Sequence, residues 1–218
     1  VCLGGDGTYR GALALTKMGI NCVGVPCTID NDVAGTDHTI GFDTALTTIV
    51  EAVDKLRDTS SSHRRCSIIE VMGRNCGALA IHAGIAVGAE IVITSETGYD
   101  PEELIETICN AAKTKRHAIV IVAEKVTSIF DMADLISKNT PFSARSSILG
   151  HIQRGGCPTP RDRVLASCMG VKAVEELLKV SLKPRELFPW FLLSADVEKP
   201  VFIVDLEEPA FIVDLEEP

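Results

Sequence analysis

Residues 117–123, His-Ala-Ile-Val-Ile-Val-Ala, are almost continuously hydrophobic. A strand with this pattern is buried on both faces, as in parallel sheets that helices cover on both sides. Similar short β-branched runs alternate along the chain with longer stretches of apolar residues at helical spacing, which predicts an α/β fold with doubly wound parallel sheets. The expected strands are 1–3, 21–25, 67–71, 90–94, 117–123 and 145–149, and the expected helices are 9–18, 40–57, 77–87, 104–112, 130–138 and 161–179.

The negative charge is concentrated at one end of the chain. The 218 residues carry a formal net charge of −9, of which −7 comes from eight acids and Lys199 within residues 196–218. The rest of the chain is therefore close to neutral, and it has no basic stripe of the kind that binds nucleic acids. The acidic end also contains the octapeptide Phe-Ile-Val-Asp-Leu-Glu-Glu-Pro twice, at 202–209 and 211–218. Two copies are too few for a solenoid, and we expect weak β character and disorder there.

The eight cysteines include no Cys-x-x-Cys pair, and the five histidines do not complete a zinc-binding spacing. Free thiols in a reducing cytoplasm are the better interpretation. No run of about 18 apolar residues that could span a membrane is present, and we see no signal peptide. The sequence starts with Val1 in what resembles the middle of a strand, so we expect a fragment of a longer protein.

The segment Gly4-Gly5-Asp6-Gly7-Thr8 links the first expected strand to the first helix. Glycines allow backbone N–H groups to approach phosphate oxygens, and a helix N-terminus favours the same anions. Asp6 could hold Mg²⁺, which prefers carboxylate and phosphate oxygens. The alternative is a tight turn in which Asp6 only caps the helix. We favour the phosphate loop.

A second polar segment, Pro26-Cys27-Thr28-Ile29-Asp30-Asn31-Asp32, follows the second strand. An extended backbone would direct Asp30 and Asp32 to the same side, and paired acids beside a phosphate suit proton abstraction and metal orientation. The alternative is an Asx-rich turn, which this segment alone would favour.

Arginines at strand ends complete the pattern. Arg65, Arg74, Arg145 and Arg154 lie beside strand ends or in loops, and Arg154 belongs to the polar segment 150–156. Guanidinium groups match phosphate oxygens in a bidentate manner. Because ligands of open α/β sheets bind beyond the carboxyl ends of the strands, these segments indicate a site for a sugar phosphate.

Four motifs, at 4–8, 28–32, 70–74 and 149–156, follow one another in an order that resembles the ATP-dependent 6-phosphofructokinases, most closely the bacterial ones. The resemblance runs from residue 1 to about 180. It implies transfer of a phosphoryl group from MgATP to the 1-hydroxyl of fructose 6-phosphate in glycolysis, with Asp30 as the base and Asp6 as the magnesium ligand. The resemblance further implies a cytoplasmic, allosteric homotetramer.

The resemblance also implies a role for each matching residue. The nucleotide loop would be Gly5, Asp6, Gly7 and Thr8. Thr28, Asp32 and Arg74 would support the transferring phosphoryl group beside Asp30. Fructose 6-phosphate would be bound by Met72, Gly73, Arg74, Glu124, His151 and Arg154, with Arg65 and Arg145 reaching its 6-phosphate from a neighbouring subunit. An allosteric nucleotide site would contain Arg57, Glu90, Lys113 and Lys115.

The same resemblance divides the chain into parts. These are a partial ATP- and magnesium-binding domain at 1–41 and 154–183, a fructose 6-phosphate-binding domain at 42–153, and a divergent acidic tail at 184–218. About a hundred N-terminal residues of the family, including its first phosphate loop, have no counterpart here. An uncompleted sheet exposes edges and apolar faces, so we expect the 218-residue polypeptide alone to be poorly folded and inactive.

Three alternative functions share part of this pattern. Pyrophosphate-dependent members of the family usually carry an acid in place of Gly7 and a lysine in place of Cys27, so ATP is the expected donor. Lipid and NAD kinases share the Gly-Gly-Asp-Gly turn but do not explain the other motifs. A non-catalytic regulatory subunit of the same fold would be expected to lose Asp30 or the arginines, and all of these are present.

Overall fold

The computed structural model describes residues 1–182, 202–203 and 211–212. The chain divides into two compact units: unit 1 comprises Val1–Thr28, Val33–Gly41 and Pro160–Pro218, and unit 2 comprises Ile29–Asp32 and Phe42–Thr159. Each unit has its own parallel strands with helices on both sides, so the predicted α/β fold class is confirmed.

Unit 2 is built on a four-stranded sheet in the order β4-β5-β3-β6, in which all neighbouring strands are parallel. Its strands are β3 (Arg65–Val71), β4 (Ile91–Ile93), β5 (Ala118–Ala123) and β6 (Ser143–Ile148). Its helices are α2 (Phe42–His63), α3 (Ala78–Val87), α4 (Pro101–Ala111), α5 (Ile129–Asn139) and the short 3₁₀ helix η1 (Gly150–Arg154). The expected buried strand at 117–123 is β5, the all-buried inner strand.

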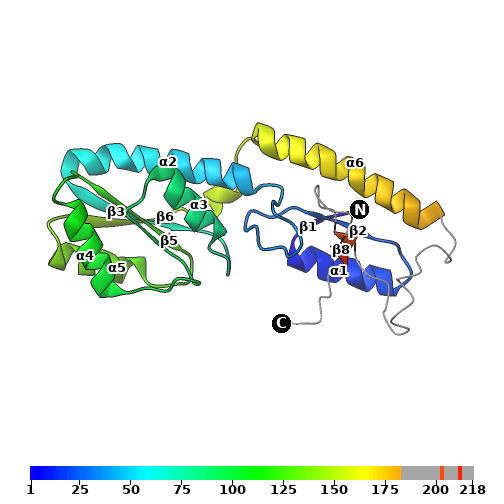
Figure 1. Cartoon of the computed structure of the whole chain (residues 1–218), viewed down its shortest axis with the longest axis horizontal. Coiled ribbons are helices and arrows are strands. Elements are labelled where there is room, and N and C mark those ends of the chain that lie inside the picture. The colour runs from blue at the N-terminus through cyan, green and yellow to red at the C-terminus, as the bar shows by residue number, and fades with distance from the viewer. Residues whose placement is uncertain (183–201, 204–210, 213–218) are drawn as a thin grey trace. The chain divides into compact units, whose positions relative to one another are not determined.

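The alternation of side chains along the strands explains why helices cover both faces of this sheet. Ile69 and Ile121 pack with α2 and α3, whereas Ile68 and Val120 pack with α4 and α5. Figure 1 shows the two helix pairs on opposite sides of β3, β5 and β6. Both sets of strand residues are apolar because neither face of the sheet meets water.

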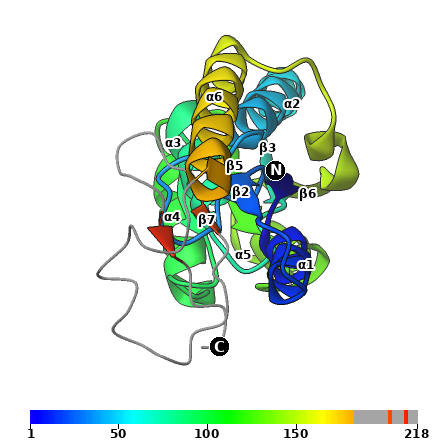
Figure 2. The ribbon, with the colours of Figure 1, turned by 90° about the vertical axis from the view of Figure 1, so that its right-hand side faces the viewer.

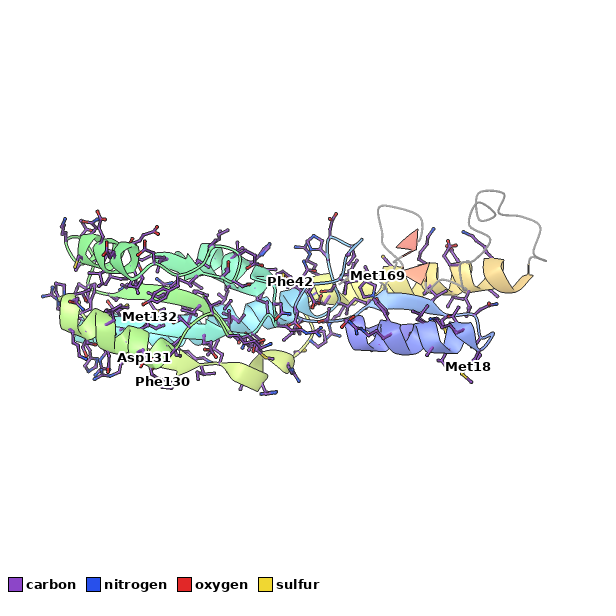
Figure 3. The ribbon with its side chains drawn as sticks, turned by 90° about the horizontal axis from the view of Figure 1, so that it is seen from below. Met18, Phe42, Phe130, Asp131, Met132 and Met169 are labelled. Atoms are coloured by element: carbon purple, nitrogen blue, oxygen red, sulfur yellow. The ribbon has the colours of Figure 1, made fainter. Side chains whose placement is uncertain are left out.

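Helix α5 shows how helical periodicity selects the buried side chains. Met132 is 1% exposed and packs against the sheet, whereas Phe130, two residues earlier, is 62% exposed. Two residues correspond to roughly 200° of helix rotation, so these side chains lie on opposite sides of the helix. Figure 3 labels both residues on α5.

Unit 1 contains β1 (Cys2–Gly4), α1 (Asp6–Lys17), β2 (Val23–Pro26), α6 (Pro160–Leu182), β7 (Phe202–Ile203) and β8 (Phe211–Ile212). The strands follow the order β1-β2-β7-β8, with β7 parallel to β2 and antiparallel to β8. The start of each octapeptide copy thus forms a two-residue strand. The expected disorder of the acidic tail otherwise lies outside the described residues.

Helices α1 and α6 cover opposite faces of β2. Val23 and Val25 pack with α6, while the intervening Gly24 faces Tyr9 of α1 so closely that an added Cβ would lie 2.7 Å from the tyrosine ring. Figures 1 and 2 both show β2 between these helices. Strand β1 occupies an edge of the sheet, and its Leu3 is 64% exposed.

The helix limits differ in places from those predicted. Helix α1 begins at Asp6 rather than at residue 9, because Gly5 serves as its N-cap. Helix α2 continues to His63, beyond the expected end at 57, since Ser60 is buried and its hydroxyl hydrogen-bonds Ser67 of β3 at 2.5 Å. Segment 150–154, expected as a loop, forms η1. Among the described residues, no helix is both long and apolar enough to cross a membrane.

The N-terminus of α3 is held by a carboxylate from a later segment. Glu96 accepts a hydrogen bond from the backbone N–H of Gly77 at 2.8 Å, and this bond, with smaller contributions from Thr94 and Ser95, lowers the pKa of Glu96 to about 2. An anion at a helix N-terminus also interacts favourably with the helix dipole. Glu96 therefore stabilises the fold in its ionised form.

We expect Glu96→Gln, made in the complete reading frame that contains this chain, to lower the urea midpoint of unfolding at pH 7, with a difference from the unsubstituted protein that disappears near pH 2. The pKa of Glu96 is about 2 in the folded state and 4.5 in its unperturbed state, so its contribution is complete above pH 4.5 and is lost as the pH falls toward 2. The measurement is urea unfolding at several pH values. Equal midpoints at pH 7 would contradict this role.

Candidate functional site

The phosphate loop predicted in unit 1 joins β1 directly to α1. An added Cβ at Gly4 would lie 2.1 Å from the Oγ1 atom of Thr8, so this close turn requires glycine. At Gly7 no atom lies within 4 Å of an added Cβ, so this side of the loop is open. Gly7 and Thr8 in the first turn of α1 are exposed, and the N-terminus of a helix favours anions such as phosphate.

Asp6 lies in the first turn of α1 and forms an ion pair with Arg10 at 3.0 Å. The N-cap residue is Gly5, which has no side chain that could cap the helix. A single partly exposed carboxylate beside a phosphate loop fits Mg²⁺, which commonly takes one or two carboxylates together with substrate phosphates.

Thr28 packs beside the same loop, since its Cβ lies 3.4 Å from an added Cβ at Gly5. Its carbonyl oxygen accepts a hydrogen bond from the Thr39 hydroxyl at 2.6 Å. The N–H of Gly41 donates to the buried carboxylate of Asp162 at 3.0 Å. These bonds attach segment 33–41 to the end of β2 and the start of α6, and sequence reasoning identified neither Asp162 nor its role.

The acidic segment that follows enters unit 2 and is not extended. Asn31 has a φ of +52°, in the left-handed region, so the predicted extended geometry of residues 30–32 is wrong. A left-handed residue redirects the chain, which Asn tolerates better than most residues. A carboxylate oxygen of Asp32 instead lies 3.8 Å from the guanidinium group of Arg74, with which Asp32 forms an ion pair.

Asp30 lies in a group of charged residues from three other segments. Burial raises its pKa, and the carboxylates of Asp32 and Glu124 raise it further, while Arg154 and Arg74 act in the opposite direction. A carboxylate with a raised pKa is a stronger base, and proton abstraction is most efficient when the pKa approaches the working pH. The structure therefore brings Asp30, Asp32, Arg74, Glu124 and Arg154 together.

The loop after β3 carries Met72, Gly73 and Arg74 at the carboxyl end of the sheet. The N–H groups of Gly73 and Arg74 both donate to Oε1 of Glu124, at 3.3 and 2.6 Å. The N–H of Met72 donates to Oε1 of Gln153 at 3.1 Å. Gly73 and Arg74 have φ angles of +149° and +59°, so the loop turns sharply away from the strand.

Glu70 and Gln153 were not among the predicted site residues. Burial raises the pKa of Glu70, and the neighbouring Glu124 raises it further, which places Glu70 beside the same acidic group. Gln153 is 1% exposed and lies on η1 between the exposed His151 and Arg154. Its position within the polar motif 149–156 could have marked Gln153 as a site residue. That motif does not indicate that its side chain is buried.

Arg65 and Arg145 lie away from this group. Arg65 pairs with Ser143 and Ser67 pairs with Arg145, so both arginines lie on the same face of the sheet, Arg65 at the beginning of β3 and Arg145 on β6 opposite Ser67. Strand β3 has 7 residues, so its two ends are roughly 20 Å apart. Met72–Arg74 follow its other end, so the backbone of Arg65 is farthest from that loop, and Arg145, opposite Ser67, lies between the two.

The four residues predicted for an allosteric site are spread over one end of unit 2. Glu90 forms an ion pair with Lys115 at 2.6 Å and accepts a hydrogen bond from the N–H of Ile119 at 2.5 Å. Arg57 donates to the carbonyl oxygen of Val87, and Lys113 donates to Asn110 at 2.7 Å. The structure joins Glu90 and Lys115 directly, whereas Arg57 and Lys113 contact other groups.

Comparison with known proteins identifies the family. The family model described as Phosphofructokinase matches residues 1–177. This chain belongs to the phosphofructokinase family. The resemblance of its four motifs to that family is therefore confirmed.

Two curated relatives show how much of a phosphofructokinase this chain spans. It is 56% identical over 180 residues to the ATP-dependent 6-phosphofructokinase of Tolumonas auensis, a match that covers 82% of this chain and 56% of that protein. It is 52% identical over 207 residues to ATP-dependent 6-phosphofructokinase 1 of Clostridium perfringens, which covers 91% of this chain and 65% of that protein. The chain thus spans less than two thirds of the length of either relative.

Solved phosphofructokinase structures share this fold. The phosphofructokinase from Saccharomyces cerevisiae superposes with a TM-score of 0.78 at 32% identity, covering 94% of this chain and 30% of that chain. A pyrophosphate-dependent phosphofructokinase from Marinobacter aquaeolei superposes with a TM-score of 0.70 at 22% identity, covering 83% of this chain and 51% of that chain. The second likeness concerns the fold alone.

Proposed function

We propose that this phosphofructokinase chain carries the reaction centre for phosphoryl transfer from ATP to the 1-hydroxyl of fructose 6-phosphate. The observation that carries the proposal is the position of Asp30, a carboxylate with a raised pKa among Asp32, Glu124, Arg154 and Arg74. Asp30 would accept the proton of the attacking hydroxyl. Positive charge near the transferred phosphoryl group lowers the barrier, because this reaction depends mainly on positioning and electrostatic stabilisation.

The donor would bind to unit 1. The N–H groups at the start of α1 and residues Gly5, Gly7 and Thr8 would contact the phosphates, and Thr28 would support the same loop. Asp6 would hold Mg²⁺, which supplies charge neutralisation to the phosphates when bound. We propose that the ATP-binding part expected at residues 1–41 and 154–183 corresponds to unit 1, and that the sugar phosphate binds to unit 2, in a cytoplasmic enzyme.

Fructose 6-phosphate would bind in unit 2 to Met72, Gly73, Arg74, Glu124, His151 and Arg154. Arg65 is the first residue of β3 and Arg145 lies on β6 opposite Ser67, so both are away from the Met72–Arg74 loop and would serve the 6-phosphate bound by a neighbouring copy. The distance between the ends of β3 supports a homo-oligomer, and we propose the tetramer typical of the family. A regulatory nucleotide would be bound near Arg57, Glu90, Lys113 and Lys115.

The test is a coupled assay for fructose 1,6-bisphosphate, run on the 218-residue chain and on the complete reading frame that contains it. We expect the complete reading frame to form product with ATP and Mg²⁺, at least tenfold faster than with pyrophosphate, and the 218-residue chain to form none. Product with pyrophosphate only would favour the pyrophosphate-dependent alternative. Product with neither donor would contradict the proposal, and robust ATP-dependent turnover by the 218-residue chain would contradict its expected inactivity.

The pH dependence provides a separate prediction for Asp30. Its raised pKa means that kcat/KM should decline on the acid side as the pH falls toward a value above 3.8, the unperturbed pKa of aspartate. Arg154 lowers the pKa of Asp30, so Arg154→Met should move this acid limb to higher pH. Arg116→Met, at an exposed position before β5, makes the same charge change and should leave the limb in place. An unmoved limb in Arg154→Met would contradict the coupling.

A further inference from the structure

Three consecutive backbone N–H groups after β3 are held by side chains from distant parts of unit 2. Glu124, which follows β5, accepts from Gly73 and Arg74, and Gln153 of η1 accepts from Met72. The left-handed conformation at Arg74 and the φ of +149° at Gly73 prevent this loop from continuing the hydrogen bonds of the sheet. The shape of the loop therefore depends on these two acceptors.

Gln153 uses both ends of its side-chain amide. Its Oε1 accepts from the N–H of Met72 at 3.1 Å, and its Nε2 donates to the carbonyl oxygen of Gly150 at 2.9 Å. The side chain is 1% exposed, so an unsatisfied amide there would be costly. The amide thereby connects the loop after β3 to the first residue of η1.

We propose that Gln153 is a positioning residue of the sugar-phosphate site. It fixes the position of η1, which carries the exposed His151 and Arg154, relative to the Met72–Arg74 loop. Both halves of the site then meet the ligand in one arrangement without rearranging when it binds. This inference rests on the proposed function, because the ligand is fructose 6-phosphate.

The test compares Gln153→Met and Gln153→Glu in the complete reading frame that contains the chain. Gln153→Met preserves the side-chain volume but removes both hydrogen bonds. We expect its KM for fructose 6-phosphate to rise about 10- to 100-fold with kcat within about threefold of the unsubstituted enzyme. Hydrogen exchange at the Met72 amide should accelerate about tenfold, the effect of losing one hydrogen bond.

Gln153→Glu provides a conservative variant with a distinct signature. When ionised, the introduced carboxylate can accept from Met72 but cannot donate to Gly150, whereas the protonated carboxyl group can do both. Burial raises the pKa of a carboxyl group at this position, so the KM of Gln153→Glu should approach that of the unsubstituted enzyme as the pH is lowered toward that pKa, and the Gln153→Met variant should show no such recovery. Simple destabilisation would not produce this pH-dependent rescue.

Ser60→Ala is the matched control. It removes the buried Ser60–Ser67 hydrogen bond between α2 and β3, so it should lower stability and leave KM unchanged. If the unsubstituted enzyme is active and Gln153→Met leaves both the KM and the hydrogen-exchange rate at Met72 unchanged, the positioning role alone is overturned. An unsubstituted enzyme that neither binds nor phosphorylates fructose 6-phosphate would overturn the proposed function and this inference with it.

Discussion

Asp30→Asn in the complete reading frame is expected to lower kcat by about 10²- to 10⁴-fold, the usual contribution of a general base. Asparagine has nearly the same shape as aspartate but cannot accept the proton of the attacking hydroxyl. Burial and the neighbouring Asp32 and Glu124 raise the pKa of Asp30, which makes its carboxylate a stronger base. The uncharged asparagine amide cannot act as a base at all. The measurement is the steady-state rate of fructose 1,6-bisphosphate formation at saturating ATP.

A loss confined to kcat would support the base role. Asp58→Asn is the matched control, because Asp58 is exposed on α2 and the substitution makes the same chemical change outside the site. Its kcat should stay within about twofold of the unsubstituted enzyme, as expected for surface changes. An unchanged turnover number in Asp30→Asn would remove Asp30 from the mechanism and favour a non-catalytic subunit.

Gly73→Ala is expected to weaken fructose 6-phosphate binding by 100-fold or more and to lower the free energy of unfolding by about 2 to 4 kcal/mol. Gly73 has a φ of +149°, and an added Cβ would lie 2.3 Å from the carbonyl oxygen of Cys76. That oxygen belongs to the backbone of a tight turn closed by a hydrogen bond from Cys76 to Gly73 at 2.8 Å. The clash therefore displaces the Met72–Arg74 loop rather than a flexible side chain.

Calorimetric titration with fructose 6-phosphate and urea unfolding measure the two effects. Gly170→Ala is the control, since Gly170 lies within α6 and no atom lies within 4 Å of an added Cβ. Alanine there should stabilise the protein by about 0.5 to 1 kcal/mol through helix propensity and leave binding unchanged. Native-like binding in Gly73→Ala would show that the loop tolerates a side chain and would contradict its assigned role.

Local sequence patterns predicted which helices and strands form, but were less accurate about the residues at which they begin and end. The continuous apolar run at 117–123 indicated a strand buried on both faces, and β5 is such a strand. Helical periodicity alone did not locate the end of α2, because its last turns carry Ser60 and other small polar residues. The partner that buries Ser60 is Ser67 of β3, which no helical pattern can indicate.

The residues of the candidate site were predicted, but the backbone conformation that positions them was not. The resemblance to the family placed Asp30, Arg74, Glu124 and Arg154 among the candidates, and the structure brings them together. The extended geometry expected at Asp30–Asp32 was wrong, because Asn31 adopts a left-handed conformation that Asn, Asp and Gly can each accept. The choice between such conformations depends on the groups around the segment.

The sequence by itself determined the doubly wound α/β class and the order of the phosphofructokinase motifs, because hydrophobic periodicity and glycine-rich strand ends are local properties. Only the tertiary structure decided that Gln153 is buried against Met72, that Glu124 holds two backbone amides, and that Arg65 and Arg145 lie on one face of the sheet, on β3 and β6. These contacts join residues 50 to 81 positions apart or depend on strand register. They arise from how whole elements pack, which no local pattern records.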